Sequence, residues 1–80
     1  MWADPDQYKR IGARLATERK RLGITQVDLA TRLGKPQSFV SAYESGQRRL
    51  DLVEFLRVAK ALGLDPQTLF ADVVGALHFS

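Results

Sequence analysis

The feature that most constrains the fold is a start and stop signal for short helices that repeats along the chain. An acidic cap followed by proline, typical of a helix start, occurs at Asp4-Pro5 and again at Asp65-Pro66. Apolar residues then recur at helical spacing, and no strand-like alternation is present in the sequence. Glycines that favour helix termination follow several of these apolar runs: Gly23, Gly34, Gly46 and Gly63.

These signals predict five helical segments joined by short turns. Asp28, three residues after the capping residue Thr25, occupies the slot of a capping box. We therefore expect an all-α fold, a compact bundle of five short helices. The segments run from Pro5 to Gly23, from Thr25 to Gly34, from Pro36 to Gly46, from Asp51 to Gly63, and over about 66–77.

Length and composition limit what can stabilise such a bundle. Eighty residues allow a single domain, 1–80, with one small core. The sequence contains no cysteine, so helix packing, helped by dimerisation, must replace disulfides or thiolate metal sites. The lone histidine, His78, has no cysteine or second histidine to share a metal, and we expect neither metal nor cofactor.

The sequence also argues against an enzyme and against a membrane or secreted protein. It offers no nucleophile–base pairing, no glycine-rich phosphate loop and no clustered carboxylates beyond helix caps. No apolar run approaches the ~20 residues of a membrane span, and the N-terminus lacks the order of a signal peptide. We expect a cytoplasmic, non-enzymatic protein.

Positive charge is concentrated in the middle of the chain. Residues Lys9 to Arg49 include ten basic and three acidic side chains, whereas the net charge of the whole chain is only +3. This distribution is typical of one face that meets a polyanion. A solvated surface that happens to be basic is the alternative reading of charge alone.

The segment from Leu33 to Gly46 is unusual because its outward positions are small and hydrogen-bonding rather than charged. With Val40 at the inward centre, steps of 100° place Gln37 at the flank and put the following residues outward: Ser38, Ser41, Ala42 and Ser45. Two short helices joined at Gly34 fit a helix-turn-helix over about 25–46, whose second helix enters the DNA major groove. Phe39 falls to the side of this second helix, where it packs toward the fourth helix or presses a thymine methyl.

Two stretches of the sequence resemble a known family. The stretch "TQVDLATRLGKPQSFVSAYESG" is similar to the helix-turn-helix of Cro and phage-repressor-like proteins, the Xre-type transcriptional regulators. "DLVEFLRVAKALGLDPQTLF" looks like the fourth helix and the start of the fifth in that family. The resemblance spans roughly Ile11 to Phe70 and implies a lambda-repressor-like DNA-binding domain. It is carried by Gln26, Leu29-Ala30, Leu33-Gly34, Gln37-Ser38, Val40-Ser41 and Glu44 before Gly46.

The resemblance implies roles for individual side chains. Gln26 would touch a phosphate or an outer base, and Arg19 would pair with Glu44 to hold the second motif helix. The helix at about 36–45 would read bases in the major groove, and glutamine can bridge N6 and N7 of adenine whereas serine discriminates weakly. The expected base contacts are Gln37, Ser38, Ser41 and Ala42.

Three further basic residues are expected at the DNA backbone. Arg48 and Arg49 follow the glycine turn, where a loop often meets phosphates. Lys35 departs from the family, which usually has an apolar residue there; its stem would cover the core edge while its ammonium reaches a phosphate. Pro36 replaces a capping Ser or Thr, which removes one hydroxyl and stiffens the start of the helix.

The resulting hypothesis is a sequence-specific regulator of double-stranded DNA, acting mainly as a repressor. A homodimer would read a pseudo-palindromic operator, and we expect no membrane and no small-molecule ligand. The alternative is a protein-interaction module such as the antitoxin of a toxin–antitoxin pair, although only His-Phe-Ser follows Leu77 to cover a toxin. The last segment carries more large apolar residues than the interior needs. These residues are the expected dimer contact: Leu69, Phe70, Val73, Val74 and Leu77.

Overall fold

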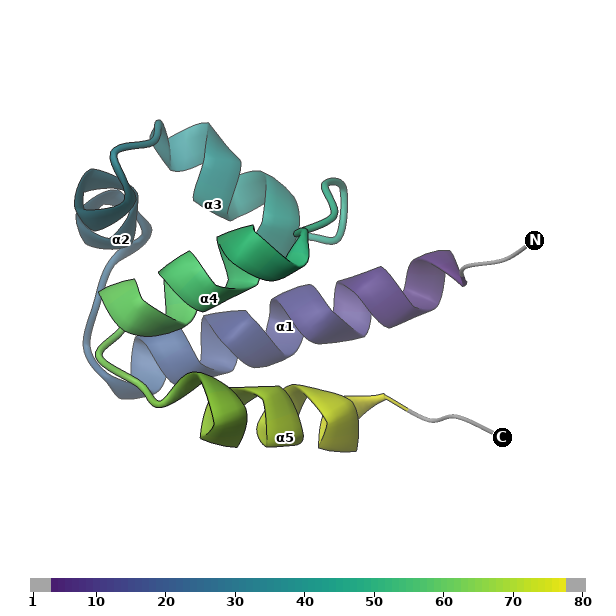
Figure 1. The fold of residues 1–80 in the computed structure, drawn as a ribbon. Coiled ribbons are helices and arrows are strands. Elements are labelled where there is room, and N and C mark those ends of the chain that lie inside the picture. The colour runs from purple at the N-terminus through teal and green to yellow at the C-terminus, as the bar shows by residue number, and fades with distance from the viewer. Residues whose placement is uncertain (1–3, 78–80) are drawn as a thin grey trace.

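The computed structural model describes residues 4–77, and these residues form five helices and no strand. The all-α prediction is therefore confirmed, whereas His78 lies outside the described residues. None of these helices is long and apolar enough to cross a membrane. In chain order the helices are α1 (Pro5–Arg21), α2 (Gln26–Leu33), α3 (Gln37–Glu44), α4 (Leu52–Ala61) and α5 (Pro66–Ala76) (Figure 1).

Helix starts lie where the sequence places its capping residues. The Asp4 and Asp65 side chains accept hydrogen bonds from the backbone amides of Asp6 and Thr68. Thr25 and Asp51 each open a capping box, in which the cap and the third helical residue exchange hydrogen bonds. At Pro36, the N-cap of α3, the described residues provide no side-chain cap. The first amides of α3 therefore lack the side-chain acceptor that the other helices have.

The turn between α2 and α3 depends on Gly34. Its φ of 67° lies in the left-handed region that glycine adopts without steric cost. In this conformation the Lys35 amide donates to the Ala30 carbonyl at 3.0 Å, and the Gly34 amide donates to the Thr31 carbonyl at 3.1 Å. The chain can thus reverse sharply, and α3 packs across α2.

One hydrophobic core joins all five helices. α1 packs against α3 and α5, while α4 contacts α2 and α5, and the start of α1 lies at the same end of the molecule as the end of α5 (Figure 1). Ala30, in the middle of α2, is also buried. The largest fully buried side chains come from α1, α2, α3, α4 and α5: Leu15, Leu29, Val40, Val58 and Leu69.

Burial divides the apolar residues of α4 and α5 into two groups. Leu69 and Val73, two of the five residues expected at a dimer contact, are only 1% and 5% exposed because they fill the core beneath α1 and α4. Other large apolar residues of the two helices face solvent. The large apolar side chains left exposed on α4 and α5 are Leu52, Val53, Leu56, Phe70 and Val74.

Gly12 allows the close approach of α1 and α3. It is buried in the middle of α1, and a Cβ atom added there would overlap the carbonyl oxygens of Tyr43 and Glu44. The backbone of α1 thus lies directly against the end of α3, which fixes the position of that helix relative to the longest helix of the protein.

Candidate nucleic-acid interface

The solvent-facing side of α3 carries short polar side chains. Gln37, Ser38 and Ser41 are exposed, and Ala42 is half-buried beside them. Val40 and Tyr43, on the opposite side of the helix, are 0% and 2% exposed. α3 therefore presents hydrogen-bonding groups close to its backbone while its apolar side is anchored in the core.

A chain of hydrogen bonds connects this face to the scaffold. The Gln37 amide nitrogen donates to the Gln26 amide oxygen at 3.2 Å, and the Gln26 amide nitrogen donates to Glu44 Oε1 at 2.9 Å. The oxygen and the nitrogen of the Gln26 side-chain amide thus each have a partner. Gln26, the first residue of α2, therefore positions the Gln37 side chain.

Arg19 holds the far end of this chain. Its Nε and Nη2 donate to Glu44 Oε2 and Oε1 at 2.7 and 3.0 Å, and its Nη1 donates to the Ile24 carbonyl at 2.8 Å. The hydrogen bonds to Glu44 raise the pKa of Arg19 above its usual value despite desolvation. Because both side chains are largely buried, the pair loses hydration on folding, which offsets much of its attraction. Its hydrogen bonds join the end of α3 to the end of α1.

Arg48 has a different environment from the one expected of a phosphate contact. Its Nη1 and Nη2 donate to Glu54 at 3.0 and 2.8 Å, and its guanidinium lies 4.6 Å from the centre of the Phe39 ring. The hydrogen bonds from Arg48, with that of the Asp51 amide, lower the pKa of Glu54 to about 2. Arg48 therefore fastens the α3–α4 loop to the start of α4.

Phe39 is half-buried and packs against the core, edge to face with Tyr43 at 5.6 Å between ring centres. The contacts of the Phe39 ring are thus with the protein core and with residues of its own helix. Lys35 lies on the same ring, with its Nζ 5.7 Å from the ring centre.

Arg49 and Lys35 are exposed, and neither has an acidic partner among residues 4–77. The Arg49 guanidinium lies 4.7 Å from the Tyr8 ring centre, which leaves its donors open to an anion. This part of the chain also contains no group of three metal-ligating side chains.

Sequence reasoning did not single out Gly12 or Glu54. Gly12 had a visible signal, because a glycine inside a helix costs about 1 kcal/mol relative to alanine and needs a packing reason. Glu54 was visible only as a residue at the third helical position after Asp51, and nothing in the sequence paired it with Arg48.

Comparison with known proteins identifies the family to which this helix-turn-helix belongs. Residues 15–69 match the family model HTH_3, described as helix-turn-helix. The uncharacterized HTH-type transcriptional regulator y4dJ of Sinorhizobium fredii (strain NBRC 101917 / NGR234) is 32% identical over 59 residues, which cover 74% of this chain and 77% of that protein.

Two solved structures are similar at higher identity. The XRE-family like protein from Pseudomonas syringae pv. tomato str. DC3000 is 40% identical with a TM-score of 0.78, covering 91% of this chain and 89% of that one. The restriction-modification controller protein C.AhdI from Aeromonas hydrophila is also 40% identical, with a TM-score of 0.72 and coverage of 81% and 97%.

The fold and the anchored, polar α3 define a small helix-turn-helix protein. Because the family model covers most of the chain, the protein belongs to the Xre-type helix-turn-helix family of DNA-binding transcriptional regulators.

Proposed function

We propose that the protein is a sequence-specific repressor that reads the major groove of double-stranded DNA with α3. The observation that carries this proposal is the exposed Gln37, held by Gln26 in a hydrogen-bonded chain that ends at the Glu44–Arg19 pair. A reading side chain fixed before binding loses less conformational freedom when it meets a base. Repression follows if the operator overlaps a promoter, because a bound protein blocks access to it.

Gln37 is the proposed specificity residue, and Ser38, Ser41 and Ala42 are proposed to contact bases beside it. Glutamine can donate to N7 and accept from N6 of one adenine, whereas a serine hydroxyl pairs with several base edges. The short serine and alanine side chains support this proposal in a second way, since they let the floor of the groove come close to the helix.

Gln26, Lys35 and Arg49 are the proposed backbone contacts. Lys35 and Arg49 are exposed cations without acidic partners in the described part of the chain, and Gln26 opens α2 next to Gln37. Arg48, expected from the sequence in the same role, is bound to Glu54. We assign Arg48 to holding the loop that presents Arg49.

The protein is further proposed to act as a homodimer through the exposed apolar face of α4 and α5. Two copies related by a two-fold axis would place their α3 helices about 34 Å apart, on half-sites one helical turn apart. The same apolar face also supports the second candidate, an interaction module such as an antitoxin, in which a different protein covers it.

Selection of bound duplexes from a random library, with purified protein, tests the proposal. We expect a palindromic consensus, and we expect Gln37→Ala to lose the preference at one base pair per half-site at a cost of about 1–3 kcal/mol. Gln7→Ala, on the first turn of α1, is the matched control and should retain the full consensus. Failure to enrich any sequence would favour the interaction module.

A further inference from the structure

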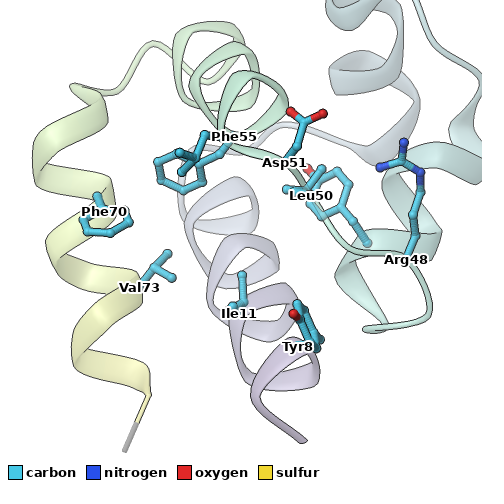
Figure 2. Close-up of a pocket in the computed structure, with 10 residues that line it drawn as sticks. Tyr8, Ile11, Arg48, Leu50, Asp51, Phe55, Phe70 and Val73 are labelled. Carbon is cyan, nitrogen blue, oxygen red and sulfur yellow. The ribbon is translucent and has the colours of Figure 1, made fainter. Parts of the chain in front are cut away.

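The loop between α3 and α4, residues 45–51, lies against the first turns of α1. A Cβ atom added at Gly46 would lie 2.8 Å from Lys9 Cα and 2.9 Å from Lys9 N, so the two backbones are in direct contact. In Figure 2, Tyr8 lies on the side of α1 nearest this loop, and Leu50 of the loop lines the same hollow as Tyr8. The position of the loop therefore depends on the start of α1 as well as on α3.

Two neighbours hold Arg49, an exposed cation of this loop. The Arg49 carbonyl accepts a hydrogen bond from Arg48 Nη1 at 2.8 Å, and Arg48 is itself bound to Glu54. The Arg49 guanidinium lies 4.7 Å from the centre of the Tyr8 ring. Because Tyr8 is half-buried and Arg49 is exposed, the ring is the more fixed partner and restrains the guanidinium.

Stacking on a ring restrains a guanidinium without using its hydrogen-bond donors. The ring contacts the face of the guanidinium, whereas the N–H groups lie in its plane and can still donate to phosphate oxygens. A long side chain that is held before binding also loses less conformational freedom when it meets DNA. A stacked Arg49 should therefore bind a phosphate more tightly than an unrestrained arginine.

Tyr8 lies outside the part of the chain that matches the family model, since that match begins at residue 15. Its ring lines a hollow whose other members include Ile11 and Leu50, and an aliphatic side chain would serve for packing there. An aliphatic side chain would not attract a guanidinium, because the attraction comes from the face of an aromatic ring. The contact with Arg49 is therefore the property that requires an aromatic residue at this position.

We propose that Tyr8 is a positioning residue for DNA binding, which holds the Arg49 guanidinium where it meets a phosphate. This inference rests on the proposed function, in which Arg49 contacts the DNA backbone. It adds α1 to the elements on which DNA binding depends, although Tyr8 acts only through Arg49. Because backbone contacts carry no sequence information, Tyr8 should affect specific and nonspecific duplexes alike.

The first test is a double-mutant cycle measured by fluorescence anisotropy on a selected and a nonspecific duplex. Tyr8→Leu should weaken binding to both duplexes about threefold, the loss expected for an exposed cation–π contact. Tyr8→Phe keeps the ring face and should bind as the wild type does. In the Arg49→Ala background, Tyr8→Leu should have no further effect. Gln7→Ala, on the neighbouring residue of α1, is the matched control and should leave the affinity unchanged.

The second test measures the stack without DNA. Protons above an aromatic ring are shifted upfield in NMR spectra, so the side-chain protons of Arg49 should be shifted upfield in the wild type and in Tyr8→Phe. The shift should disappear in Tyr8→Leu. Absence of the shift in the wild-type protein would overturn the proposal, whatever the protein binds.

Three binding results would also overturn the proposal. Unchanged affinity of Tyr8→Leu would show that the stack does not contribute to binding. Equal weakening with and without Arg49 would show that Tyr8 supports the fold or the loop and not the Arg49 side chain. Tighter binding by Tyr8→Leu would show that the ring holds Arg49 away from DNA.

Failure of the proposed function has a different outcome. A wild-type protein that binds no duplex would contradict DNA binding itself, and an Arg49→Ala variant of unchanged affinity would contradict the assignment of Arg49 to the backbone contacts. Either result would remove the role of Tyr8 as well. Failure of the Tyr8 proposal alone would leave wild-type binding and the effect of Arg49→Ala intact.

Discussion

Arg48 and Arg49 are neighbours in the sequence, but their guanidinium groups have different partners. Arg48 donates to both oxygens of Glu54, whereas Arg49 lies over the Tyr8 ring and has no acidic partner in the described residues. A cation stacked on an aromatic ring keeps its in-plane N–H donors available. The two arginines therefore divide structural support and anion binding between them.

Arg49→Ala should lower affinity for all duplexes alike and reduce the slope of log affinity against log salt by about one. The reason is that one phosphate contact, and the counterion it releases, is lost. The measurement is fluorescence anisotropy of a specific and a nonspecific duplex over a range of salt concentrations. Arg49→Lys, which keeps the charge, should retain the slope, and an unchanged slope in Arg49→Ala would remove Arg49 from the backbone contacts.

Glu54→Gln tests the Arg48–Glu54 pair through pH. The pKa of Glu54 in the folded protein, about 2, lies below its ordinary value of 4.5. A depressed pKa means that the ionised carboxylate contributes stability above about pH 4.5 and that this contribution is lost as the pH falls through about 2. Glutamine keeps a capping-box partner for the Asp51 amide but does not ionise.

We therefore expect urea unfolding midpoints of the wild type and Glu54→Gln to differ at neutral pH and to converge as the pH approaches 2. Arg48→Met should reduce the pH dependence in the same way, because it removes the group that depresses the pKa most. Curves that stay parallel from neutral pH to pH 2 would show that the pair is not the source of this pH dependence.

At the scale of helices, the parts of the structure that local chemistry controls could be predicted. Asp4, Thr25, Asp51 and Asp65 cap helices in the structure as the sequence predicts, because a cap needs only its own side chain and amides two or three residues away. The inward positions of α3 followed from its 3.6-residue period for the same reason.

Features that depend on which helices meet could not be predicted. α4 carries apolar residues around most of its circumference, so periodicity did not reveal that Leu52, Val53 and Leu56 face solvent. The Arg48–Glu54 pair likewise depends on where the loop returns to α4. The Arg19–Glu44 pair came from family resemblance, since a separation of 25 residues has no local signal.

Gly12→Ala should destabilise the protein by about 1–3 kcal/mol, because the added Cβ overlaps two backbone carbonyls of α3 and neither can move without shifting the helix. Gly75→Ala is the matched control: Gly75 lies in α5, and its Cβ would meet nothing within 4 Å among the described residues. Alanine there should stabilise by up to about 1 kcal/mol. Equal effects of the two changes in urea unfolding would contradict close packing at Gly12.

For the molecule as a whole, three of the exposed apolar residues of α4 and α5 gather at one place. Leu52, Leu56 and Phe70 border a groove between the two helices, and Phe70 packs on Phe55 inside it. Exposed apolar residues that are contiguous on a small protein are typical of an interaction site. In a two-fold dimer the same face of each copy covers the other, so one surface suffices.

Leu56→Glu should convert a dimer into a monomer. Leu56 is 51% exposed, so the folded chain accommodates the carboxylate with little change in helix content, but two carboxylates brought together in an apolar interface would be desolvated and would repel each other. Sedimentation should give the mass of two chains for the wild type and of one chain for the variant, and the variant should bind a single half-site as a monomer. Val27→Glu is the matched control, because Val27 is 55% exposed on α2 and lies outside this face. A wild type that sediments as a monomer at every concentration, or a Leu56→Glu variant that remains a dimer, would exclude this face as the subunit interface.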